Sequence, residues 1–382
     1  MYAGRVAQLD RLAIAVPFLD LAPSHEPLRG ALLEEIADLF DSGRFTNGPQ
    51  VAAFEEAFAE FCGTSECVGT GSGLDALRFA LIATGIERGD EVIVPANTFV
   101  ATLEAVTQAG GVPVPVDVSE DDYNIDVAAA AAAVTRRTRC LLPVHIYGQL
   151  ADMRALLALA EREGFVVVED AAQAHGAERD GVRAGASGDA AAFSFYPGKN
   201  LGAAGDAGAL VTNDSATAKT VRQLREHGQA RKYTHEREGY TSRLDTLQAL
   251  VLLHKLPHLT RWNDERREVA AAYAERLDGV GDLQLPPVAP NSDPVWHLFV
   301  VRTAEPERLQ RFLSERGIGC GRHYPEPVHL TRAYAWLGLP AGSLPVSERL
   351  AREVVSLPIF PGMTEEQVEA VTASIVDYFD GG

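Results

Sequence analysis

The residue of this sequence best suited to covalent chemistry is Lys199, which stands in the glycine-rich segment SFYPGKNLGAAGDAGA. The segment follows an apolar run, so we expect the lysine in a tight loop after a strand. Its glycines leave room for a planar group beside the chain. A lysine held out of water loses its proton more easily, and its neutral amine can then attack a carbonyl group. Taken alone, the pattern also describes an ordinary surface lysine.

A second polar cluster closes the apolar run of the segment VVVEDAAQAHG. Asp170 ends a predicted strand there, and Gln173 follows three residues later. A carboxylate at a buried strand end is costly unless it meets a cation or hydrogen-bond donors. Asp170 therefore suggests a bound cationic group, although in isolation it could equally cap the next helix.

The third feature is the segment GTGSG, residues 69–73, which precedes a predicted helix. Glycines allow the backbone to approach a ligand closely, and the start of a helix offers unpaired N–H groups to an anion. A phosphate group would suit this site. The spacing matches neither of the common nucleotide-binding glycine motifs, and alone it could be a simple turn.

Together the three features match the needs of pyridoxal 5′-phosphate (PLP). A lysine holds the aldehyde of this cofactor, a carboxylate keeps its ring nitrogen protonated, and a glycine-rich helix start holds its phosphate. All three features are expected at strand ends or strand–helix junctions, where open α/β sheets build their sites. The combination therefore predicts a PLP site.

The elements that must position these residues alternate between strands and helices. The expected strands are residues 91–95, 112–118, 140–148, 165–170, 191–196 and 208–213. Several are apolar throughout, which is typical of strands covered on both faces. Helical patterns dominate after about residue 217, and Thr364 with Gln367 forms a capping box that opens the last helix. We predict an α/β fold with a large domain over residues 1–255 and a smaller α+β domain over residues 256–382.

Composition narrows the class of protein. The chain has 382 residues, with 34 basic and 53 acidic side chains and a net charge of −19. This excess of acid disfavours nucleic acids and anionic membrane surfaces as partners, and no apolar run is long enough for a membrane helix. The four cysteines form no CxxC pair, so we expect no metal site, no disulfide framework and a cytoplasmic location.

The chain resembles the nucleotide-sugar aminotransferases of the DegT–StrS type. The segment around Lys199 is very similar to the active-site segment of that family. Further matching blocks run in the same order over nearly the whole chain; they are VPFLDL, FTNGPQVAAFEEAFAEFCG, SGLDAL, GDEVIVPANTFVAT, PVHIYGQLADM, VVEDAAQAHGA, GYTSRLDTLQA and HYPEPVHL.

The resemblance implies a fold and a set of roles. The fold would be the fold type I of PLP-dependent transferases, with a mostly parallel seven-stranded sheet in the large domain and two subunits sharing their active sites in a homodimer. Lys199 would bind the cofactor covalently and move a proton, and Asp170 would pair with the ring nitrogen. The remaining implied cofactor contacts are Gln173 at the phenolic oxygen, Phe99 on the ring face, and Ser72, Gly73, Leu74 and Ser194 at the phosphate.

Two positions depart from the family pattern. Thr241 stands where the family usually has an asparagine that reaches the phosphate of the neighbouring subunit, and a threonine has a shorter reach. Leu74 stands where many members have a threonine, which removes a hydroxyl contact. A backbone N–H at Leu74 would still serve the phosphate, and this form is associated with the branch that makes 3-amino deoxysugars.

The implied reaction has two halves: L-glutamate gives its amino group to the cofactor, and a nucleotide-linked keto sugar then accepts it. Tyr196, His323, Tyr324 and His329 resemble the sugar-contacting positions of enzymes that act at C-3 of dTDP-3-keto-6-deoxyhexoses, although the two histidines could simply shape a loop. Amination at C-4 of a dTDP-4-keto-6-deoxyhexose is the main alternative. A cyclitol or aminobenzoate-type substrate, a sugar dehydratase and a non-catalytic PLP-binding regulator are further ones. A lysine rather than a histidine at position 199 favours transamination over dehydration.

Overall fold

The core of the molecule is a seven-stranded sheet in which six strands are parallel. The computed structural model describes residues 15–381. The strand order is β1-β9-β8-β5-β4-β2-β3, and only β9 runs antiparallel to its neighbours. The strands are β1 (Glu66–Thr70), β2 (Glu91–Pro95), β3 (Val112–Val116), β4 (Thr138–Leu141), β5 (Val166–Asp170), β8 (Ala190–Ser194) and β9 (Gly208–Thr212). The sheet confirms the predicted α/β class.

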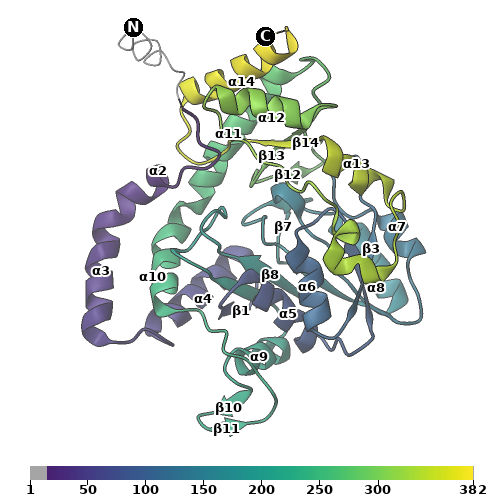
Figure 1. Ribbon diagram of the computed structural model, residues 1–382. Helices are drawn as coiled ribbons and strands as arrows, with labels where there is room; N and C mark the ends of the chain where they lie inside the picture. The colour runs from purple at the N-terminus through teal and green to yellow at the C-terminus, as the bar shows by residue number, and fades with distance from the viewer. Residues whose placement is uncertain (1–14, 382) are drawn as a thin grey trace.

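Helices cover both faces of this sheet (Figure 1). One face packs against α5 (Gly73–Ala83), α6 (Val100–Gln108) and α9 (Ser215–Leu224). The other face packs against α4 (Pro49–Cys62), α8 (Met153–Glu163) and α10 (Thr246–Lys255), with the short α7 (Val127–Ala132) at its side. Consecutive residues of one strand enter opposite cores: Val68 of β1 faces the first helix layer, and Cys67 faces the second. Burial on both faces explains why the strands are apolar throughout.

A smaller core lies at the C-terminal end of the chain. Here α11 (Leu259–Leu277), α12 (Pro306–Glu315) and α14 (Glu365–Phe379) pack around the antiparallel pair β13 (Phe299–Arg302) and β14 (Val354–Leu357). Val16, near the N-terminus, is buried in the same core. The predicted capping box is present, with Thr364 and Gln367 bonding each other's backbone N–H groups at the start of α14. Helix α13 (Pro345–Glu353) precedes β14.

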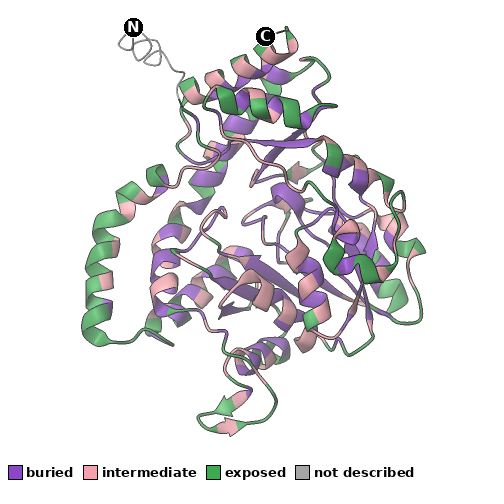
Figure 2. Cartoon of the chain, in the orientation of Figure 1, coloured by how far each residue is buried: buried purple, intermediate pink, exposed green. Residues whose placement is uncertain are grey.

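Two segments stand out from these cores. The first is the N-terminal arm, formed by α2 (Ala22–His25) and α3 (Arg29–Ser42). Leu39 is its one buried residue in α3, and Figure 2 shows this helix exposed along nearly its whole length. The second is a hairpin of β10 (Gln229–Arg231) and β11 (Thr234–His235), which projects beyond α9 (Figure 1). A further small sheet joins β6 (Glu178–Arg179), β7 (Val182–Arg183) and β12 (Ser292–Asp293).

One predicted strand is much shorter than expected. The run 140–148 was expected to be extended throughout, but β4 ends at Leu141 and a 3₁₀ turn covers Ile146–Gly148. Pro143 has no N–H to donate to a neighbouring strand, so the ladder cannot continue through it. The chain instead turns at Tyr147 toward the carboxyl edge of the sheet.

Within residues 15–381, no helix combines the length and the apolar character needed to cross a membrane.

Candidate active site

A cavity of about 620 Å³ opens at the carboxyl ends of the parallel strands. This is the edge at which open α/β sheets bind ligands, because the loops that leave the strands converge there. The lining residues that the sequence analysis singles out are Ser72, Gly73, Leu74, Phe99, Asp170, Gln173, Ser194, Tyr196, Lys199, His323 and Tyr324. The fold therefore brings eleven of the thirteen candidate residues to one site.

Lys199 lies half-buried in the loop after β8, with its backbone N–H donated to Tyr196 O at 2.8 Å. Within the described residues, its Nζ forms no hydrogen bond within 3.5 Å and no ion pair within 4.0 Å. Burial lowers the pKa of the amine to about 8, and the nearby Asp170 carboxylate opposes this shift. A larger share of neutral amine near neutral pH suits a group that must attack an aldehyde.

Asp170, the last residue of β5, is buried and receives two hydrogen bonds. The Thr102 hydroxyl donates to its Oδ2 at 2.8 Å, and the Ala172 N–H donates to its Oδ1 at 3.2 Å. Thr98 lies 2.7 Å from Thr102 Oγ1. Since the Thr102 proton is used on the carboxylate, Thr98 must donate to Thr102. Burial raises the pKa of Asp170, while Thr102 and Lys199 lower it.

Gln173 is fixed by both ends of its amide. Its Oε1 accepts the backbone N–H of Tyr147 at 2.7 Å, and its Nε2 donates to the Tyr324 hydroxyl at 3.2 Å. These contacts settle which end of the amide carries the NH₂ group. One Nε2 hydrogen is left for an acceptor in the cavity.

The start of α5 forms a small cradle beside β8. The Ser72 Oγ caps the helix by accepting the Asp75 N–H at 3.1 Å. The N–H groups of Gly73 and Leu74 have no acceptor among residues 15–381. A Cβ at Gly73 would lie 2.6 Å from the Cβ of Ser194, so only glycine allows the helix start to approach that serine. Free N–H groups beside a serine hydroxyl fit a phosphate.

The outer part of the cavity is aromatic. Phe99 is 53% exposed, with its ring centroid 5.5 Å from that of Tyr324, and Tyr196 is 58% exposed on the lining. His323 stacks on Phe18 at 5.6 Å, and its Nδ1 lies 2.8 Å from the Ser356 hydroxyl. Burial, with a contribution from Lys199, lowers the pKa of His323 to about 4. At neutral pH this imidazole is uncharged.

Two candidate residues lie outside the cavity. The expectation that His329 contacts the substrate is corrected: the imidazole is buried, with Nε2 3.3 Å from Glu348 Oε1, because the residue lies in a 3₁₀ turn that packs inward. Thr241 is exposed at the base of the hairpin, and its hydroxyl lies 3.0 Å from His227 Nε2. Among the described residues, Thr241 is not part of the cavity lining.

Several lining residues were missed from the sequence. Phe18 lies in the block VPFLDL, Thr102 follows Phe99 by three positions, and His297 lies before β13. Thr98 lies just before Phe99, the N-cap of α6, and Thr102 lies in the first turn of that helix. The two threonines close to Phe99 were the available signal, but their role depends on Asp170 lying beside Thr102.

The low pKa of Lys199 predicts how cofactor attachment depends on pH. The rate at which cofactor-free protein binds PLP covalently should rise with pH and level off above about 8. The sign follows because only the neutral amine reacts, and its share grows as pH rises through the pKa. Stopped-flow absorbance between pH 6 and 10 measures this. A rate still rising steeply at pH 10 would indicate an ordinary lysine and contradict the prediction.

The amine of Lys199, the buried carboxylate of Asp170 and the phosphate cradle at the start of α5 lie together at the carboxyl edge of an α/β sheet. This combination is typical of PLP-dependent transferases. Residues 28–376 match the model of the DegT/DnrJ/EryC1/StrS aminotransferase family. The chain belongs to this family and is an aminotransferase.

Related proteins match this chain over nearly its full length. The chain is 50% identical over 363 residues to a dTDP-3-amino-3,4,6-trideoxy-alpha-D-glucose transaminase of Streptomyces venezuelae, covering 95% of this chain and 96% of the relative. A crystal structure of DesV from S. venezuelae in complex with a ketimine intermediate superposes with a TM-score of 0.94 at 49% identity, covering 96% of this chain and 99% of that one. The NtdA structure from Bacillus subtilis with bound PMP, the amine form of PLP, has a TM-score of 0.89 at 30% identity, covering 97% and 86%.

These matches confirm three expectations from the sequence: the family, the fold class and the use of PLP. They favour transamination over the dehydratase and the non-catalytic regulator.

Proposed function

We propose that this protein transfers the amino group of L-glutamate to C-3 of a dTDP-linked 3-keto-6-deoxyhexose. The observation that carries the proposal is the 50% identity, over 95% of the chain, to a transaminase named for a dTDP-3-amino sugar. The glycine-leucine pair at positions 73 and 74 supports the same branch. Identity this high over nearly the whole chain favours a shared substrate class over a shared fold alone.

We assign the following roles to the residues around the cofactor. When bound, PLP supplies an aldehyde that links to amines and a ring that accepts electrons from the substrate carbon. Lys199 Nζ would hold the cofactor, and its amine would take a proton from the carbon of the amino donor and return it. Asp170 would keep the ring nitrogen protonated, and Thr102 orients this carboxylate by donating to its Oδ2. Gln173 would donate its remaining Nε2 hydrogen to the phenolic oxygen.

The rest of the cavity would bind and shield the two substrates. The N–H groups of Gly73 and Leu74, with Ser72 and Ser194, hold the phosphate. Phe99, which lines the cavity beside Tyr324, would cover one face of the cofactor ring and exclude water from it. Tyr196, His323 and Tyr324, which line the cavity, would contact the sugar and its diphosphate.

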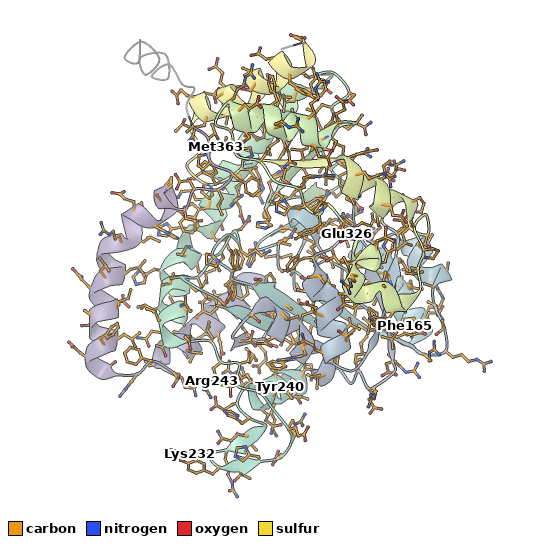
Figure 3. All side chains as sticks on the ribbon, in the orientation of Figure 1. Phe165, Lys232, Tyr240, Arg243, Glu326 and Met363 are labelled. Atoms are coloured by element: carbon orange, nitrogen blue, oxygen red, sulfur yellow. The ribbon has the colours of Figure 1, made fainter. Side chains whose placement is uncertain are left out.

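We also propose that the active unit is a homodimer with shared sites. The arm and the hairpin expose apolar side chains that a monomer would leave in water: Leu33 is 55% exposed, Phe40 68% and Tyr233 82%. Lys232 lies at the far end of the hairpin, while Tyr240 and Arg243 lie at its base (Figure 3). A projecting hairpin with a basic tip suits the diphosphate of a substrate in the neighbouring subunit, and Thr241 would reach that subunit's phosphate.

The dimer can be tested by replacing Phe40 with glutamate and measuring mass by sedimentation velocity. The wild type should sediment as a dimer of about twice the 41.0 kDa chain, and the variant should shift toward a monomer because a buried charge opposes association. A wild-type monomer that remains fully active would contradict shared sites.

Two further proposals concern the chain as a whole. We divide it into a PLP-binding domain over residues 1–255 and a C-terminal domain over residues 256–382. The second core around α11, α12, α14, β13 and β14 supports two units. Val16 packs into that second core, while Val328 and Leu350 pack into the core of the large sheet, so the chain crosses between the two units. We place the protein in the cytoplasm, a location supported by four free cysteines.

The substrate proposal is tested by loading the protein with the amine form of the cofactor and adding keto sugars. A dTDP-3-keto-6-deoxyhexose should restore the PLP absorption band at micromolar to millimolar concentrations. A dTDP-4-keto-6-deoxyhexose should do so at least about tenfold less efficiently, since the amine would face the wrong carbon. A clear preference for the 4-keto sugar would replace this proposal with the C-4 alternative.

A further inference from the structure

Tyr147 has an unusual backbone for a large residue. It lies in the 3₁₀ turn Ile146–Gly148 with φ 59° and ψ 5°, in the left-handed region. This conformation is unfavourable for a non-glycine residue. The side chain is also buried, at 7% exposure. A strained and buried residue at the carboxyl edge of the sheet needs contacts that hold it there.

The left-handed turn directs the backbone of Tyr147 toward the cofactor side of the cavity. Its N–H donates to Gln173 Oε1 at 2.7 Å, and its carbonyl accepts the Leu298 N–H at 3.3 Å. Leu298 immediately precedes β13, so this second bond ties the turn to the C-terminal core, which lies above the sheet in Figure 1. One residue thus contacts both parts of the molecule through its main chain.

The side chain of Tyr147 reaches the opposite wall of the cavity. Its hydroxyl donates to the backbone carbonyl of His323. The next acceptor, Asn97 Oδ1, is more distant at 3.4 Å. Burial raises the pKa of the Tyr147 phenol well above its usual value, so the group stays a neutral donor at any physiological pH. The His323 imidazole is held separately by Ser356.

These bonds close a ring of four residues. Tyr147 bonds Gln173 through its N–H and His323 through its hydroxyl, and Gln173 bonds Tyr324 through Nε2 at 3.2 Å. His323 and Tyr324 are adjacent in sequence. The group that orients the cofactor-facing amide is therefore tied to the segment that faces the sugar.

We propose that Tyr147 is a positioning residue that sets the His323–Tyr324 segment for the nucleotide sugar, independently of cofactor binding. The inference rests on the proposed function, in which that segment contacts the keto sugar. The two hydrogen bonds of Tyr147 can be removed independently. The bond to Gln173 uses the main-chain N–H, so it survives a change of side chain. The bond to His323 uses the hydroxyl, so it is lost when the hydroxyl is removed. Removing the hydroxyl should therefore weaken the placement of the His323–Tyr324 segment and leave the orientation of Gln173 unchanged.

The test is Tyr147→Phe, with Tyr273→Phe as a matched control. Tyr273 is fully buried and donates its hydroxyl to the Pro358 carbonyl at 2.8 Å, among residues that do not line the cavity. Both variants lose one buried hydroxyl that bonds a backbone carbonyl, so both should lose similar thermal stability. Any kinetic difference between the two variants is then due to the place of Tyr147 beside the active site and not to a general loss of stability.

In Tyr147→Phe we expect the KM for the keto sugar to rise about fivefold to thirtyfold, the range set by one hydrogen bond in a buried site. The rate of the glutamate half-reaction, the absorption maximum and the affinity for PLP should change less than about twofold. Tyr273→Phe should leave all four values near wild type. Equal losses in both half-reactions, or a keto-sugar KM matching the control, would overturn the proposal.

The result separates this inference from the proposed function. A wild-type protein that accepts no dTDP-linked keto sugar would refute the proposed function before the variant is examined. A wild type that turns over such a sugar, together with an unchanged Tyr147→Phe, would refute the inference and leave the function standing.

Discussion

Replacing Lys199 with alanine should reduce transamination on the order of 10⁴-fold or more, because the change removes both the covalent attachment and the proton carrier. Lys199 is the one lysine that lines the cavity within residues 15–381. Its amine has no partner there to compete for the cofactor. The ultraviolet–visible spectrum should change as well: the variant should lose the absorption band of covalently bound PLP and show no clean shift on addition of L-glutamate.

Lys219→Ala is a suitable control for this change. Lys219 is an exposed residue of α9 that does not line the cavity, so its loss should leave both the spectrum and the rate near wild type. If Lys199→Ala kept more than about a tenth of wild-type activity, or responded to L-glutamate as the wild type does, the assignment of Lys199 would be wrong.

The second large effect is expected at Asp170. An asparagine at this position has nearly the same size and can still accept a hydrogen bond from Thr102. It carries no negative charge, so it cannot stabilise a protonated ring nitrogen. We expect turnover to fall about 10²-fold to 10³-fold, the usual loss when one electrostatic group at a reacting centre is removed. Steady-state rates with saturating L-glutamate and keto sugar measure this loss.

The same variant should alter Lys199. The Asp170 carboxylate raises the pKa of the Lys199 amine, against the larger effect of burial. Without that negative charge the ammonium form is less stable, so the amine should lose its proton at a lower pH. The plateau of covalent PLP attachment should therefore begin below the wild-type value of about 8. Asp206→Asn, at an exposed position of the cavity lining, is the control; a plateau that moves up in Asp170→Asn would contradict the pairing.

The strands could be predicted well where apolar, β-branched runs are closed by turns. The segment 91–95 matches β2 at both ends, and 208–213 exceeds β9 by one residue. The run 140–148 was overpredicted because its apolar character continues through Pro143 into a turn that is buried for a different reason. An apolar composition predicts that a segment is buried, but it does not distinguish a buried turn from a buried strand.

The site could be predicted where each residue ends a strand or opens a helix, since the carboxyl edge of a parallel sheet gathers such positions. That reasoning places Lys199, Asp170 and Ser72 correctly in one cavity. It could not find Thr102 or Tyr147, whose roles depend on which neighbour the fold sets beside them. It also misplaced His329, because the sequence around two prolines does not show which side chains turn inward to meet Glu348.

Thr241 illustrates why the structure of a single chain does not reveal every site contact. Its sequence position suggested a contact with a phosphate, yet within its own subunit it faces His227 at the base of an exposed hairpin. A residue that acts across a subunit interface meets its functional partner only when the two subunits associate. Its role therefore follows from the proposed dimer and from nothing in the local packing.

The most direct test of the whole account is to follow labelled nitrogen. The purified protein, loaded with PLP, would be incubated with ¹⁵N-labelled L-glutamate and a dTDP-3-keto-6-deoxyhexose, and the product would be analysed by NMR and mass spectrometry. We predict a dTDP-sugar carrying ¹⁵N at C-3, with 2-oxoglutarate formed in equal amount. Label at C-4, or glutamate consumption with no amino sugar formed, would contradict the central claim.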